Sequence, residues 1–316
     1  MAFDADPPGR PKVDRPEAAP PKADPPAEMT LARRMWQLFE PVHAVTYFAP
    51  EAVAAYSDAG LRGFWRSYFA GRAAPLGAPD AAPVTASFFV FAPAMVARAL
   101  PHVWSRITPE RALETRLAGA RAALAQPTAG IDPDRLARLA ELMRTAARNV
   151  AVGGRPLAAA NQALPWPDDP VGILWQATTI LREHRGDGHV AALVTAGLDG
   201  IEATVWRTAL GEGPGRADFQ RARGHTDADW DAAADRLRER GWLDRTGGPT
   251  ERSRLTRLGI ESVTDRLAEP TWHALGPENV AECAAALAPI AARAAETIRW
   301  PNPIGLPDPR AGAGPD

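Results

Sequence analysis

The residues best suited to chemistry lie together in the segment 182–189, which has the sequence Arg-Glu-His-Arg-Gly-Asp-Gly-His. His184, Asp187 and His189 fall within six positions of one another. Imidazole and carboxylate groups bind zinc, iron and similar ions, and an imidazole also serves as a general acid or base near neutral pH. A separation of five positions does not place two side chains on one face of a helix. The segment therefore predicts a loop in which His184 and His189 are metal ligands or, with Asp187, catalytic groups of unknown reaction.

A second interpretation treats the same segment as a turn between two helices. Gly186 then ends the first helix in a left-handed conformation, and Asp187 caps the start of the next helix. Both interpretations remain open from the sequence, and both require the helix to break near residue 186.

Composition narrows the classes of protein to which the chain can belong. The 316 residues are 46% hydrophobic and 23% charged, which is typical of a globular protein. A formal charge of −2 gives no overall attraction to nucleic acid or to anionic membranes. Both lysines, Lys12 and Lys22, lie near the N-terminus, so a pyridoxal-phosphate site and a P-loop nucleotide site are excluded. The single cysteine, Cys283, is expected to be a small core residue.

The chain has no apolar run long enough to span a membrane and no secretory signal, so we expect a cytoplasmic protein. Residues 1–28 are rich in proline and are expected to be a disordered tail. An amphipathic pattern starts at Leu31 and predicts the first helix.

An internal repeat suggests that the chain contains two related halves. Trp36-Gln37 recurs as Trp175-Gln176, and the Ala-Gly-Leu-Arg-Gly of residues 59–63 recurs as Ala-Gly-Leu-Asp-Gly at residues 196–200. We predict a tandem duplication with a pseudo-twofold axis. The predicted division is a tail (1–28), a first half (29–155), a linker (156–167), a second half (168–300) and a flexible C-terminus (301–316).

The repeat places His43 near the position that corresponds to His184, so the two histidines are predicted to approach each other across the axis. Aromatic residues, Tyr47 among them, follow His43 at partly helical spacing. Such residues belong to a core or line an apolar cavity that has a few polar groups. The ligand-binding residues predicted for a cavity between the halves are His43, Tyr47, His184, Arg185, Asp187 and His189.

The second half has the element order of a winged helix-turn-helix domain. Its predicted helices are 172–184, 189–210, 217–223 and 226–240, followed by a hairpin with strands at 242–245 and 253–256 and a helix from residue 257. The segments 237–243 (Leu-Arg-Glu-Arg-Gly-Trp-Leu) and 255–259 (Leu-Thr-Arg-Leu-Gly) resemble the helix corner and the end of the wing in MarR-type regulators. In the first half, residues 105–108 leave almost no room for a wing.

The whole chain, with its central His-Arg-Gly-Asp-Gly-His, also resembles an actinobacterial helix-turn-helix family of unknown activity. These resemblances imply a mainly α fold of two winged-helix-like halves, the first degenerate and wingless and the second with a small β-wing.

The predicted recognition helix is poorly suited to DNA. Its first turns, Asp227-Ala228-Asp229-Trp230-Asp231, carry three aspartates where a phosphate backbone favours cations. An acidic first turn also suits the helix dipole. Arg245, Arg252 and Arg254 on the predicted wing are the candidates for contacts with phosphate.

The first functional hypothesis is a diverged tandem winged-helix protein that binds a small molecule or a metal between its halves, with an enzyme of specialised metabolism left open. The cofactor is unknown, and a metal ion or a haem-like ligand is left open. The alternative is a ligand-responsive, MarR-like transcription regulator that binds DNA. A third hypothesis is an interaction module without a site. The chain is expected to be a monomer or a homodimer, and the sequence identifies neither the ligand nor the reaction.

Overall fold

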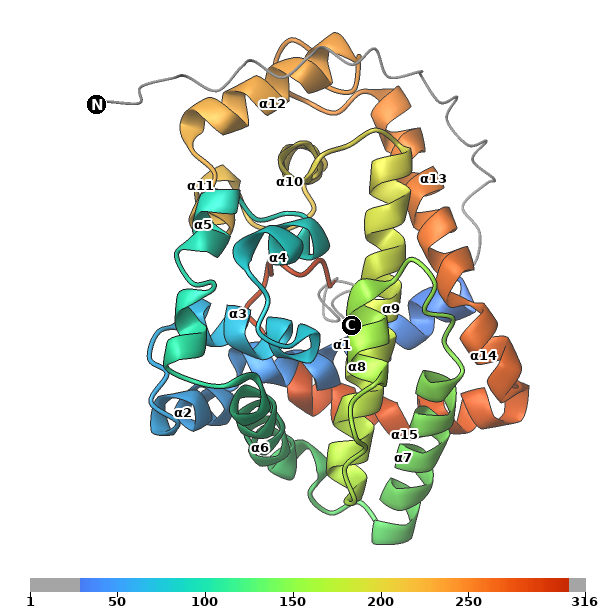
Figure 1. The fold of residues 1–316 in the computed structure, drawn as a ribbon. Helices are drawn as coiled ribbons and strands as arrows, with labels where there is room; N and C mark the ends of the chain where they lie inside the picture. The colour runs from blue at the N-terminus through green and yellow to red at the C-terminus, as the bar shows by residue number, and fades with distance from the viewer. Residues whose placement is uncertain (1–28, 307–316) are drawn as a thin grey trace.

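The structure, a computed structural model, describes residues 29–306, and this part of the chain is almost entirely helical (Figure 1). The predicted tail 1–28 and residues 307–316 lie outside the described residues. The first part of the chain forms α1 (Leu31–Phe48), α2 (Pro50–Asp58), α3 (Phe64–Ala73), η1 (Ala74–Leu76), α4 (Ala81–Phe88), α5 (Pro93–Ala97), η2 (His102–Ser105), α6 (Pro109–Thr128), α7 (Pro133–Arg148) and α8 (Pro156–Gln162). The rest forms α9 (Pro170–Thr195), α10 (Gly200–Ala209), α11 (Arg216–Arg223), α12 (Asp227–Glu239), α13 (Glu251–Ala268), α14 (Pro270–Leu275) and α15 (Pro277–Ala295).

The first helix begins where the sequence predicts it. Thr30 caps α1, because its side chain accepts a hydrogen bond from the Arg33 amide at 3.2 Å. Such a cap satisfies an amide that has no partner within the helix.

The segment 182–189 is neither a loop nor a turn, and both sequence interpretations of its backbone are wrong. It lies inside α9, which continues without a break from Pro170 to Thr195. Two glycines disfavour a helix interior by roughly 1 kcal/mol each, but packing against other segments of the same protein overcomes that cost. A Cβ at Gly188 would lie 2.7 Å from Nη1 of Arg155, so the guanidinium would have to shift to admit a side chain there.

The helix-turn-helix is formed by α11 and α12, close to their predicted bounds. Thr226 and Asp229 make a reciprocal capping box at the start of α12, and Gly224 is left-handed at φ 80°. The turn packs on the first half of the chain: the Ala92 amide donates to the Arg223 carbonyl at 2.9 Å, and His225 Nε2 lies 3.0 Å from the Val90 carbonyl. These contacts fix the position of α11 and its side chains.

The predicted β-wing is absent from the described residues, which contain no strand. One isolated bridge, Leu243 to Pro249, remains of the hairpin. The Asp244 carboxylate accepts hydrogen bonds from the amides of Thr246 and Gly248, which closes a tight turn. Thr250 then caps α13, so residues 253–256 are helical and cannot form a second strand.

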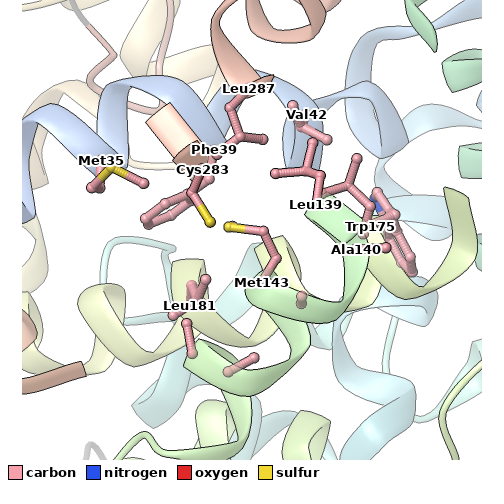
Figure 2. Close-up of a cluster of buried hydrophobic side chains, with 14 of the residues drawn as sticks. Met35, Phe39, Val42, Leu139, Ala140, Met143, Trp175, Leu181, Cys283 and Leu287 are labelled. Carbon is pink, nitrogen blue, oxygen red and sulfur yellow. The ribbon is translucent and has the colours of Figure 1, made fainter. Parts of the chain in front are cut away.

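One large core joins the two predicted halves. Side chains of α1, α6, α7, α9, α14 and α15 pack together in it, with Trp175 of α9 buried among them (Figure 2). Cys283 is fully buried in this core, as predicted, and burial raises its thiol pKa to about 12. The first helix of each predicted half packs on the last long helix of the other, α1 on α15 and α9 on α7. The duplication itself stays a prediction.

Substitution of Gly200 tests the contact between α10 and the first half. A Cβ at Gly200 would overlap the carbonyl oxygen of Phe89, a backbone atom that cannot move aside easily. We expect Gly200→Ala to lower the free energy of unfolding by about 1–3 kcal/mol, as overpacking does. Urea unfolding measures this change. Gly153→Ala is the control, since a methyl group added at Gly153 would point into open space, and equal stability of the two variants would contradict the predicted clash.

Candidate functional site

A central cavity of about 860 Å³ lies between the two predicted halves. Its walls come from α1, α3, α4, α9, α10, α11 and α13, and the segment 300–306 returns from α15 to the middle of the molecule to form part of the wall (Figure 1). Aromatic side chains, among them Tyr68, Phe88 and Phe91, line one side. Seven arginines also line it: Arg33, Arg72, Arg182, Arg185, Arg207, Arg223 and Arg257. The cavity thus combines apolar surface with a concentration of positive charge.

Segment 300–306 is tightly held rather than extended into solvent. The Asn302 side chain accepts hydrogen bonds from the amides of Gly305 and Leu306, and it donates to the Leu306 carbonyl. Asn302 and Leu306 are both buried. This part of the predicted flexible C-terminus therefore belongs to the folded protein.

A buried charge network centred on Glu183 lies beside the central cavity, which its partners Arg72 and Arg182 line. Arg72 binds both oxygens of the Glu183 carboxylate, at 2.9 and 3.0 Å, and Arg182 contacts the same carboxylate at 2.9 Å. Burial opposes the ionisation of Glu183, but the two guanidinium groups outweigh it and hold its pKa far below the usual range. Glu40, beside Arg182, has a raised pKa because burial is only partly offset by Arg182 and the Trp36 ring N–H.

His43 and Tyr47 lie behind this network, next to a smaller cavity of about 40 Å³. The Thr179 hydroxyl donates to the Trp175 carbonyl, so His43 Nδ1, 3.0 Å from that hydroxyl, must be the donor to it. His43 Nε2 then accepts from the Tyr47 hydroxyl at 3.1 Å. Burial lowers the pKa of His43 and raises that of Tyr47, so both side chains are neutral at neutral pH. The hydrogen bonds from Tyr47 to His43 and from His43 to Thr179 fix the side chains that line the smaller cavity.

Three of the predicted ligand-binding residues line the central cavity: Arg185, Asp187 and His189. Arg185 pairs with Asp265 at 2.8 Å. His189 Nδ1 lies 3.0 Å from the Thr264 hydroxyl, which itself donates to the Ile260 carbonyl, so Nδ1 is again the donor and Nε2 remains an acceptor. Burial lowers the pKa of His189 to about 4.

Asp187 has a structural partner that the sequence did not indicate. Its carboxylate accepts hydrogen bonds from the amides of Leu157 and Ala158, both at 3.0 Å, and so caps the start of α8 from a distance. Burial raises its pKa to about 6. Asp187 is therefore a cap, but for a different helix from the one predicted.

His184 lies outside the lining of the central cavity and apart from His43 and His189. Its position on α9 is about 140° around the helix from His189, since each residue turns the helix by about 100°. It lies near Ala151, and Arg155 donates to its carbonyl. His43 meets α9 at Thr179 and Trp175 rather than at His184. Within residues 29–306, no cluster of three histidine, cysteine or acidic side chains could hold a metal. The geometry thus gives no support to the metal site predicted at His184 and His189.

The exposed side of α12 is acidic, as the sequence indicates. Arg216 binds both Asp227 and Asp231 at 2.7 Å, while Arg236 turns inward to Glu202 and Asp199. The predicted phosphate contacts Arg245, Arg252 and Arg254 are exposed on the turn after α12 and on the first turn of α13. The structure thus places basic residues beside an acidic helix.

The sequence does not indicate that most of the arginines of the central cavity come together. Arg72, Arg182, Arg207 and Arg223 lie on four different helices, and no motif connects them. Nearly all the basic residues of this chain are arginine, so residue type alone did not distinguish them. Of the seven arginines, only Arg182 and Arg185 belong to the segment 182–189 that the sequence singled out.

Comparison with known proteins identifies the family. Residues 32–301 match the profile of a family described as a helix-turn-helix family. The chain belongs to this helix-turn-helix family. No curated protein and no solved structure matches it. The likeness to MarR-type regulators and the actinobacterial origin stay predictions. Among the described helices, none is long and apolar enough to cross a membrane.

The pKa of His184 predicts a loss of stability in mild acid. Burial lowers this pKa from 6.5 to about 4, so the folded state takes up fewer protons than the unfolded state between these values. The stabilising contribution is complete above pH 6.5 and is lost as the pH falls toward 4. We expect His184→Gln to reduce the drop in unfolding free energy between pH 7 and pH 5 by roughly 1–2 kcal/mol. Urea unfolding at both pH values measures it.

Asp187 acts in the opposite direction over part of this range, because its pKa is raised, so the comparison must be between variants rather than between pH values alone. His273→Gln is the matched control, since that side chain is 70% exposed. An identical pH dependence for His184→Gln and the wild type would contradict the assignment.

Proposed function

We propose that this helix-turn-helix protein binds a small organic molecule in its central cavity. The observation that carries the proposal is the cavity itself, whose volume of about 860 Å³ lies in the range typical of ligand sites. Its aromatic wall suits an apolar group, and its polar side chains suit a few directed hydrogen bonds.

The polar groups around the central cavity are already oriented, which supports this function. The pairing of Glu183 with Arg72 and Arg182 fixes one end of the wall. At the other side, His189 is held by Thr264 with its second ring nitrogen available as an acceptor. Oriented groups lose less conformational freedom when a ligand binds.

Ligand occupancy has a direct structural link to the helix-turn-helix. Arg207 of α10 and Arg223 of α11 both line the central cavity. A molecule in the cavity would therefore contact α10, which packs on α12, and α11, which precedes α12 in the helix-turn-helix. This arrangement fits a ligand-responsive protein as well as one that only stores or transforms its ligand.

Filling the central cavity tests the proposal. Gly186 lines the cavity, and a Cβ added there would have only Glu183 Oε2 within 4 Å, at 3.9 Å. The probe is N-phenyl-1-naphthylamine, a neutral aromatic amine that fluoresces when it leaves water. We expect the wild type to bind it and Gly186→Phe to bind it at least about tenfold more weakly, because the new ring takes the apolar volume.

The control is Val194→Phe on the same helix, at a side chain that is 56% exposed. Equal binding by Gly186→Phe and Val194→Phe, or no binding by the wild type, would refute the proposed function.

DNA binding is the second candidate function, and membership of a helix-turn-helix family favours it. The exposed Arg245, Arg252 and Arg254 would supply the phosphate contacts. The acidic exposed side of α12 opposes entry into the major groove.

Salt titration of duplex binding decides this candidate. If Arg245 and Arg254 each contact a phosphate, the double variant Arg245→Gln/Arg254→Gln should reduce the slope of log K against log salt by about 2. Fluorescence anisotropy with a pool of random-sequence duplexes measures the slope. Absence of salt-dependent binding at low ionic strength, or an unchanged slope, would remove DNA from consideration.

A further inference from the structure

Two arginines at the helix-turn-helix end of the central cavity differ from the other five. Arg207 comes from α10 and Arg223 from α11. Both donate to the same acceptor, the carbonyl of Pro303, at 3.4 and 2.9 Å. The two guanidinium groups therefore converge on one point of the cavity wall.

The other five arginines each have a carboxylate partner. Arg33 and Arg185 bind Asp265, Arg72 and Arg182 bind Glu183, and Arg257 binds Glu212. Among the residues that the structure describes, no carboxylate lies within ion-pair distance of Arg207 or Arg223. The acid that acts most strongly on Arg207 is Glu212, which Arg257 already holds at 2.8 Å.

Arg223 is removed from water, and Arg207 is partly so. Arg223 is only 7% exposed, and burial lowers the pKa of each arginine to about 10. Each guanidinium packs near an aromatic ring, Arg207 over Phe219 at 5.6 Å and Arg223 over Phe91 at 4.7 Å. A ring face and a neutral carbonyl stabilise a cation but do not neutralise it.

The hydrogen bonds made within the protein leave donors on both groups. A guanidinium carries five N–H donors. Arg207 donates one hydrogen bond, to the Pro303 carbonyl. Arg223 donates two, to the carbonyls of Ala222 and Pro303. Neither group makes a further hydrogen bond to residues 29–306, and both line the cavity, so the remaining donors are available to a molecule in it.

We propose that Arg207 and Arg223 form an anion subsite, which binds a carboxylate or phosphate group of the ligand. Paired guanidinium groups match the geometry and charge of such anions. The aromatic side chains Tyr68, Phe88 and Phe91 lie along the same cavity and take the apolar part of the ligand. The ligand is thus an amphipathic organic acid or phosphate ester, and this inference rests on the proposed function.

A pair of probes separates the anion subsite from the cavity as a whole. The anionic probe is 8-anilinonaphthalene-1-sulfonate, and the neutral probe of similar shape is N-phenyl-1-naphthylamine. We expect Arg207→Gln/Arg223→Gln to bind the anionic probe at least about tenfold more weakly, the loss typical of a charged hydrogen bond, and to bind the neutral probe within twofold of the wild type. Fluorescence titration of the full chain measures both affinities.

The charge-matched control is Arg62→Gln/Arg98→Gln, which removes two exposed arginines outside the cavity lining and should change neither affinity. If the anionic probe binds the Arg207 and Arg223 variant within twofold of the wild type, the anion subsite is overturned while the proposed function stands. If the wild type binds neither probe, both proposals fail.

A comparison in the wild type covers the case in which the double variant does not fold. Benzoate and benzamide have the same shape and differ in charge. Displacement of the anionic probe by benzoate at a concentration at least tenfold lower than by benzamide supports the subsite, and equal displacement overturns it. Phenyl phosphate in the same assay then distinguishes a phosphate ligand from a carboxylate ligand.

Discussion

The rest of the structure depends on the continuity of α9 through Gly186, Asp187 and Gly188. The helix is buried over most of its length, and the other helices of the main core pack around it. Arg155 lies close against Gly188, and Asp187 caps α8. These contacts with the segment around α8 hold α9 intact where local propensity would favour a break. Because successive residues point about 100° apart, continuity distributes residues 182–189 around the helix. Glu183 pairs with Arg72 of α3, Arg185 and His189 contact α13, and His184 lies near Ala151.

The central cavity owes its charge to the use of arginine rather than lysine. A buried lysine can lose its proton, whereas a guanidinium stays charged even when burial lowers its pKa to about 10, as for Arg207 and Arg223. Carboxylates balance most of this charge, and each pairing also connects two elements, as Arg72 of α3 does with Glu183 of α9. The charge left without a carboxylate lies at one end of the cavity, where two helices and the segment 300–306 meet.

The helix-turn-helix presents opposite charges on its two sides. Its outer helix carries Asp227 and Asp231 on the exposed surface, while Arg207 and Arg223 on the supporting helices point into the cavity. The turn is attached to the first half of the chain through Ala92 and His225. The proposed ligand would lie against Val90 and Arg223, whose backbone carbonyls make these contacts, while the outer surface of α12 offers little to a phosphate backbone. This distribution of charge is the physical basis for placing ligand binding before DNA binding.

The sequence by itself determined the local features: the start of α1 at Leu31, the approximate bounds of α11 and α12, the burial of Cys283 and the acidic surface of α12. Each depends on residues close together in the chain, where spacing and side-chain type are sufficient. Tertiary structure decided the rest. Gly186 and Gly188 indicate a break by propensity, but contacts from Arg155 and α8 keep the helix intact. The second predicted strand became the start of α13, because Thr250 caps a helix there. The arginines of the central cavity come together only through packing, since helices far apart in the sequence carry them.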